Sequence, residues 1–137
     1  MPVWQKAMDL AEQVFATTEP LPRKEDYGLT SQIRRSALSV SANIAEGFGR
    51  HHTKDKLNFY YASRGSLAET KSHLIYGFRV HYFNSSEFTC LAQLVDNIWE
   101  ELNKLIASLR PKPLALDSTL LLISTSTLNL SLNLNLS

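Results

Sequence analysis

Apolar side chains recur every three or four positions along most of the chain, which is the spacing of one face of an α-helix. The most regular stretch ends near residue 110, and its apolar positions alternate between spacings of three and four: Phe88, Leu91, Val95, Ile98, Leu102, Leu105 and Leu109. This unbroken heptad pattern predicts a long helix with one buried face. Ser85 or Ser86 is expected to cap its start, and Pro111 to end it.

Three earlier segments repeat the same spacing less regularly. Residues 3–17 predict a first helix, residues 29–47 a second, and residues 54 to about 82 a third. Prolines follow the first segment and glycines follow the second, and both are typical of helix ends. Four helices joined by short connections predict an all-α fold, an antiparallel up-down-up-down four-helix bundle.

The third predicted helix contains two glycines, and each is expected to cost about 1 kcal/mol relative to alanine. We interpret Gly65 as a point of close helix packing and Gly77 as a bend. Thr53 is expected to be the N-cap of this helix.

Two cations lie on the edge of the apolar face of the same helix. Arg64 and Lys71 are expected either to extend outward to solvent or to pair with a carboxylate such as Glu46 or Glu69.

The second predicted helix has more than one distinctive face. Its core face is apolar and comprises Leu29, Ile33, Ala37, Val40, Ile44 and Phe48. A strip of mostly small residues beside it would permit another helix to approach closely, so this helix is expected to have partners on more than one side. The polar strip of Arg35, Asn43 and Glu46 has two interpretations: a structural network with partners on another helix or subunit, or an ordinary solvent-facing strip.

The last part of the chain differs in composition. Residues 111–137 form a Leu-, Ser- and Asn-rich low-complexity tail, and from residue 127 onward polar residues and leucines alternate strictly. Period two is a strand pattern and an aggregation risk when it is uncharged. We interpret this tail as disordered and outside the bundle domain of residues 1–110. Its many Ser, Thr and Asn residues exclude a membrane-spanning helix.

Composition and charge narrow the function. The 137 residues suit one globular domain, and the formal net charge is only +1. The charge is uneven, however, because residues 31–82 carry eight Lys or Arg against three Asp or Glu, and all four histidines. A local positive field of this kind can attract phosphates although the net charge is small.

No catalytic constellation is found in the sequence. The single cysteine, Cys90, excludes an internal disulfide, and we expect it to be a buried, inert thiol. Glu69 and His73 stand four residues apart, but the several Glu and paired Glu-x-x-His motifs of a di-iron bundle are missing. No metal, cofactor or enzymatic activity is therefore expected. No apolar leader segment is visible, so the cytoplasm is the expected location.

The segments 28–37 and 43–50 resemble the four-helix bundle proteins encoded by intervening sequences of 23S ribosomal RNA genes. Residues 3–7 and 65–69 fit the same family, and the resemblance covers roughly residues 3–110. It implies a bundle that assembles as a ring-like homopentamer. The accessory variability protein of diversity-generating retroelements is similar to this family, and there a basic pentamer is associated with nucleic acid and a reverse transcriptase. A reverse transcriptase partner would follow here only by analogy.

Our leading hypothesis is a non-enzymatic, oligomeric bundle that binds RNA or DNA without sequence specificity. The candidate residues cluster at the junction of the second and third helices, with two further arginines of lower rank: Arg50, His51, His52, Lys54 and Lys56, then Arg34 and Arg64. No aromatic platform interleaves these residues in sequence, so base stacking is not expected. The alternative is a structural or adaptor bundle whose partner is another protein.

Overall fold

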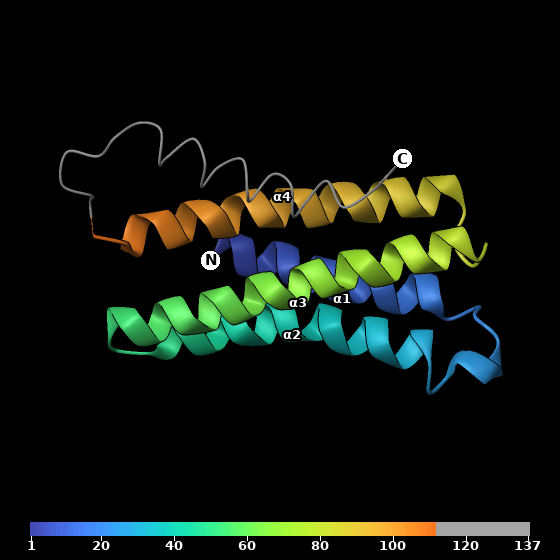
Figure 1. The fold of residues 1–137 in the computed structure, drawn as a ribbon, viewed down its shortest axis with the longest axis horizontal. Coiled ribbons are helices and arrows are strands. Elements are labelled where there is room, and N and C mark those ends of the chain that lie inside the picture. Colours follow the sequence, from blue (N-terminus) through green and yellow to red (C-terminus); the bar gives the residue numbers. More distant parts are fainter. Residues whose placement is uncertain (112–137) are drawn as a thin grey trace.

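The computed structural model describes residues 1–111, and it consists of four α-helices and one short 3-10 helix: α1 (Pro2–Thr18), η1 (Arg23–Glu25), α2 (Leu29–Gly49), α3 (Thr53–Arg79) and α4 (Ser85–Leu109). Figure 1 shows the four helices side by side, with the chain reversing direction at each connection. No strand occurs within residues 1–111. The predicted all-α four-helix fold is therefore confirmed, while all of the predicted tail beyond Pro111 lies outside the described residues.

Hydrogen bonds between α2 and α3 show that these two helices are antiparallel. The Ser63 hydroxyl donates to the carbonyl oxygen of Val40, and two turns further along α3 the Thr70 hydroxyl donates to Ser36 Oγ, each over 2.8 Å. Residue numbers thus rise along α3 as they fall along α2. Helix α1 packs against α2 and α4, and α3 packs against α2 and α4, which closes the four-membered arrangement.

The core runs the length of the bundle and takes apolar side chains from all four helices. On α4 the buried positions are Leu91, Ala92, Val95, Ile98, Trp99, Leu102 and Ile106. The predicted seam agrees at its centre but drifts at its end, where Ile106 is buried and Leu105 only partly so. A straight helix has 3.6 residues per turn, so positions spaced by 3.5 rotate gradually off the buried face.

The α3–α4 connection differs from the prediction at two points. Helix α3 ends at Arg79 and not near Tyr82, because the chain turns at His81, whose φ is 68°. The N-cap of α4 is Asn84 and not Ser85 or Ser86. Its side chain accepts from the Glu87 backbone N–H at 2.8 Å, and the Glu87 carboxylate accepts from the Asn84 backbone N–H at 3.0 Å. This reciprocal capping box fixes where α4 begins.

The close packing expected at Gly65 is found at Gly77 instead. Gly65 is exposed, and a Cβ atom built there would have no neighbour within 4 Å. A Cβ atom on Gly77 would lie 2.3 Å from Cε2 of Phe83, so this glycine makes room for a buried ring. The bend expected at Gly77 stays a prediction. The N-cap of α3 is His52, one residue before the predicted Thr53.

None of the helices within residues 1–111 combines the length and the apolar character that crossing a membrane requires.

Candidate nucleic-acid interface

The predicted basic cluster lies at one end of the bundle, on the tight turn that joins α2 to α3 (Figure 1). Arg50, His51, His52 and Lys54 are all exposed there. The two histidine rings meet edge to face with their centroids 5.2 Å apart. Lys54 forms no hydrogen bond or ion pair with any described residue. The turn therefore presents one unpaired ammonium group and two imidazoles to solvent.

The other two cations of the cluster are partly engaged by the chain itself. The Arg50 guanidinium forms an ion pair of 2.7 Å with Glu46 one turn earlier, and it lies over the Phe59 ring. Lys56 Nζ donates to the carbonyl oxygens of Phe48 at 2.9 Å and Gly47 at 3.3 Å. A cation at the C-terminal carbonyls of a helix interacts favourably with the helix dipole. Lys56 consequently has a structural role in ending α2.

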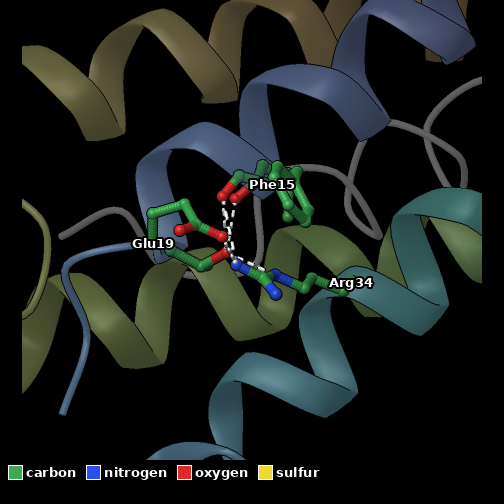
Figure 2. A network of polar contacts seen from close by, with 5 residues as sticks. Phe15, Glu19 and Arg34 are labelled. Carbon is green, nitrogen blue, oxygen red and sulfur yellow. Dashed lines mark hydrogen bonds and ion pairs between the residues drawn. The ribbon is translucent and has the colours of Figure 1, made fainter.

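Arg34 lies at the opposite end of the bundle, where it joins α2 to the last turn of α1. Its guanidinium donates to Thr18 Oγ1 at 2.8 Å, to the Phe15 carbonyl oxygen at 3.2 Å and to Glu19 Oε1 at 3.1 Å. Figure 2 shows the guanidinium directed at the end of α1, close to the Phe15 and Glu19 groups that it contacts. The structure thus separates Arg34 from the basic turn and uses it to satisfy the end of a helix.

Arg64 projects from α3 toward α4, and no carboxylate pairs with it among the described residues. One guanidinium nitrogen donates to Asn103 Oδ1 at 2.9 Å, and the group lies over the rings of Tyr61 and Trp99. Burial lowers the pKa of Arg64. The interaction with Tyr61 raises this pKa, and the nearby positive charge of Arg110 lowers it further. The expected pairing of Arg64 with a carboxylate such as Glu46 or Glu69 is therefore wrong, because its contacts are Asn103 and Trp99 on α4 and Tyr61 on α3.

Lys71 is buried, and its partner is also on α4. The expected pairing with a carboxylate is confirmed, but the partner is Asp96, at 2.6 Å from the ammonium group, and not Glu46 or Glu69. The sequence pattern could not identify this partner because it depends on how α3 and α4 are aligned.

The three residues of the predicted polar strip on α2 do not form one network within the chain. The Asn43 side-chain amide donates to the backbone oxygen of Ser39 at 2.9 Å, and Glu46 pairs with Arg50. Arg35 is exposed and has no polar partner among residues 1–111. Within one chain this agrees with the solvent-facing interpretation.

Beside this strip, the outer side of α2 carries apolar and small residues that the bundle leaves uncovered. Leu38 is 56% exposed and Phe48 is 66% exposed, although the sequence placed Phe48 on the core face. Ala42, Ala45 and Gly49 are also exposed and lie on the same side of α2 as Leu38, at helical spacing. We call these four residues the uncovered strip.

The described residues offer little support for a reactive thiol or a metal site. Cys90 is exposed, with its sulfur 3.8 Å from Gln13 Oε1, so the expectation of a buried thiol is wrong. It precedes the buried Leu91 and therefore points outward beside α1. His73 Nε2 lies 3.4 Å from Glu69 Oε1, but no three His, Cys, Asp or Glu side chains within residues 1–111 gather as a metal site. Burial raises the pKa of the Tyr60 hydroxyl, which lies in the core.

The family model described as 23S rRNA-intervening sequence protein matches residues 1–104. This chain belongs to the 23S rRNA-intervening sequence protein family. A crystal structure of a protein of unknown function from the S23 ribosomal protein family of Bacteroides thetaiotaomicron VPI-5482 has a similar fold. The TM-score is 0.69 at 20% sequence identity, covering 76% of this chain and 97% of that one. A search of curated proteins gave no match.

The family match covers part, but not all, of the basic end of this intervening-sequence protein. The match includes the α2–α3 turn and Arg64 but ends before Arg110. The Arg110 guanidinium donates to the Tyr61 hydroxyl oxygen through Nε at 2.9 Å and through a terminal nitrogen at 2.6 Å. No pattern in the sequence pairs Arg110 with Tyr61, because only the packing of α4 on α3 brings them together. Aromatic rings do lie against the cations at this end: Arg50 lies over Phe59, and Arg64 and Arg110 lie over Tyr61. The sequence had predicted no aromatic platform among the candidate residues.

Proposed function

We propose that this chain is a non-enzymatic bundle that assembles with copies of itself, as a pentamer, and binds RNA or DNA without sequence preference in the cytoplasm. The observation that carries the nucleic-acid part is the exposed α2–α3 turn, where Lys54 and the adjacent His51 and His52 extend into solvent without a neutralising partner among the described residues. Exposed cations of this kind neutralise phosphates and release counterions, which gives affinity without reading bases.

Charge distribution supports this assignment of one end of the bundle. When the connections are counted with the helices, the half of the bundle nearest the α2–α3 turn carries seven Lys or Arg against five Asp or Glu, and the opposite half carries six against seven. Repetition of the turn around a ring would join modest local charges into a continuous positive surface.

The uncovered strip on α2 supports self-association. Leu38, Ala42, Ala45 and Gly49 recur at spacings of four, three and four on one exposed side of the helix. Small side chains permit two helices to approach closely, and Leu38 supplies apolar area at one end of the strip. A second copy of the chain is the occupant we propose for this strip, with the exposed Arg35 and Glu46 at its margin available as polar contacts between subunits.

Self-association is tested by Ala42→Glu, which introduces a charge in the middle of the strip. The native chain should have a mass near five times 15.5 kDa by light scattering, and Ala42→Glu should be monomeric with unchanged helical content. Ala107→Glu is the matched control, because it makes the same change at an exposed position of α4 and should keep the oligomer. A monomeric native chain at micromolar concentration, or an Ala42→Glu variant that assembles normally, would contradict the proposal.

Nucleic-acid binding is tested with the residues of the turn that are free in the structure. The variant His51→Gln/His52→Gln/Lys54→Glu should bind labelled single-stranded RNA and DNA more weakly at low salt. Its log affinity should also depend less on log salt, because the slope falls by about 0.7 for each phosphate of a single strand that the variant no longer neutralises. Arg50 and Lys56 are left unchanged because both have contacts within the fold.

Lys24→Glu, at an exposed position of η1 at the other end of the bundle, is the control for this experiment and should bind as the native chain does. If the native oligomer fails to bind either nucleic acid at low salt, the nucleic-acid proposal is wrong.

The second candidate is the adaptor function, in which the partner is another protein. It is favoured by an apolar hollow beside the same turn, lined by Met1, Trp4, Ile44, Ala45 and Phe48. An oligomer that binds no nucleic acid would make this the better assignment.

A further inference from the structure

The seam between α3 and α4 carries polar contacts that repeat every seven residues. Lys71 on α3 meets Asp96 on α4 at 2.6 Å. Seven residues back along α3 and seven forward along α4, Arg64 meets Asn103 at 2.9 Å. The two positions are equivalent in heptad register, although Lys71 is buried and Arg64 half-buried, yet one cation has a carboxylate as its partner and the other has a neutral amide.

A second guanidinium joins the position that lacks the carboxylate. Arg110, the C-cap residue that follows α4, lies seven residues beyond Asn103 in sequence. It donates twice to the hydroxyl oxygen of Tyr61, which is three residues before Arg64. Both guanidinium groups lie over the Tyr61 ring, with their central carbons 5.2 Å and 5.5 Å from its centroid. Two positive charges therefore meet around one tyrosine.

No carboxylate offsets these charges among residues 1–111. Neither arginine forms an ion pair there, and the acceptors of both are neutral oxygens. Arg64 is half-buried, and the neighbouring charge of Arg110 is one cause of its lowered pKa. Two like charges held together without a counterion are unfavourable, and an anion between them would remove that cost. Most of the five N–H donors of Arg64 also have no acceptor within the described residues.

We propose that Arg64, Arg110 and Tyr61 form a binding site for a phosphate monoester. Such a group carries a charge of about −1.5 to −2 at neutral pH and three acceptor oxygens, which matches two guanidinium groups and one hydroxyl. Guanidinium groups bind phosphate oxygens in pairs through parallel N–H donors. The Tyr61 hydroxyl, which accepts from Arg110, retains its own proton for donation to a phosphate oxygen. Arg110 is exposed, so the site is open to ligand from solvent.

This site goes beyond the general binding of nucleic acid proposed above. A phosphodiester inside a strand carries one negative charge, whereas a terminal phosphate carries up to two. The site therefore selects a terminal phosphate over an internal one. Inorganic phosphate, a nucleoside monophosphate and a 5′-phosphorylated strand share this chemistry, and the experiment must separate these sources.

The decisive variant is Asn103→Asp, which places next to Arg64 the carboxylate that Asp96 provides to Lys71. An internal carboxylate should neutralise Arg64 and compete with the ligand, so the affinity for inorganic phosphate should fall by about tenfold or more while the melting temperature stays the same or rises. Asn97→Asp makes the same chemical change at an exposed position of the same helix and should leave phosphate binding unchanged. Arg110→Gln should weaken phosphate binding to a similar extent.

The full-length chain should be titrated calorimetrically with inorganic phosphate and a nucleoside 5′-monophosphate, and by fluorescence with one oligonucleotide carrying either a 5′-phosphate or a 5′-hydroxyl. We expect a preference for the 5′-phosphate that Asn103→Asp and Arg110→Gln remove. The turn variant His51→Gln/His52→Gln/Lys54→Glu should weaken both oligonucleotides equally and keep their ratio, so a failure of the turn proposal and a failure of this one give different results. Equal binding of the two strand ends with no uptake of inorganic phosphate would overturn the site. So would identical behaviour of Asn103→Asp and Asn97→Asp.

Discussion

Gly77→Ala should lower the free energy of unfolding by about 1–3 kcal/mol, whereas Gly65→Ala in the same helix should raise it by up to about 1 kcal/mol. Alanine improves helix propensity equally at both positions, so their different surroundings decide the sign. At Gly77 the added methyl would collide with the ring of Phe83, a residue that is 2% exposed and packs where the chain turns toward α4. At Gly65 the methyl meets nothing within 4 Å.

Urea or guanidinium denaturation of the two variants and the native chain measures both changes, and each serves as the control for the other. Stabilisation by both substitutions would mean that Phe83 does not rest on Gly77. Loss of stability with Gly65→Ala would mean that another subunit packs against this part of α3, and the oligomer mass of that variant would then distinguish the two explanations.

These two glycines show what the sequence could and could not predict about the fold. Periodicity identified all four helices because each keeps an apolar face over many turns, and that signal is local. Gly65 and Gly77 are equivalent in any local pattern, since both interrupt a helical stretch. Only the path of the chain after α3, which returns Phe83 to Gly77, separates them. The same holds for the start of α4, where Asn84 and Glu87 form a capping box and the neighbouring serines do not cap.

The candidate binding residues likewise fall into a group that could be predicted from the sequence and a group that could not. Arg50, His51, His52 and Lys54 are nearly consecutive, so their cluster at a helix junction was predictable and the structure places them together. The meeting of Arg64, Arg110 and Tyr61 was not, because it joins α3 to the end of α4 across 49 residues. The alignment of two antiparallel helices depends on the packing of the whole core, so neither helix sequence alone predicts which residues meet.

The buried cation of α3 leads to the second large effect. Lys71 is 5% exposed, and Asp96 supplies the one ion pair found for it in the structure. Asp96→Ala would leave the ammonium group buried without a counter-charge. Loss of one partner of a fully buried pair costs about 3–5 kcal/mol, but the Asp96 side chain is 48% exposed and water can partly replace it. We therefore expect a loss of about 1–3 kcal/mol.

Lys71→Met separates the loss of charge from the loss of packing. Methionine keeps most of the buried aliphatic stem and removes the need for a counter-charge, so this variant should be nearly as stable as the native chain. The double variant Lys71→Met/Asp96→Ala should recover most of what Asp96→Ala loses, and denaturation of all four chains gives the coupling between the two residues directly. The stability of Asp96→Asn should lie between that of the native chain and that of Asp96→Ala, because an amide oxygen still accepts from the ammonium, as Asn103 does from Arg64. If the double variant is as unstable as Asp96→Ala alone, the carboxylate stabilises α4 independently of Lys71, and the equivalence between this pair and the Arg64 position no longer holds.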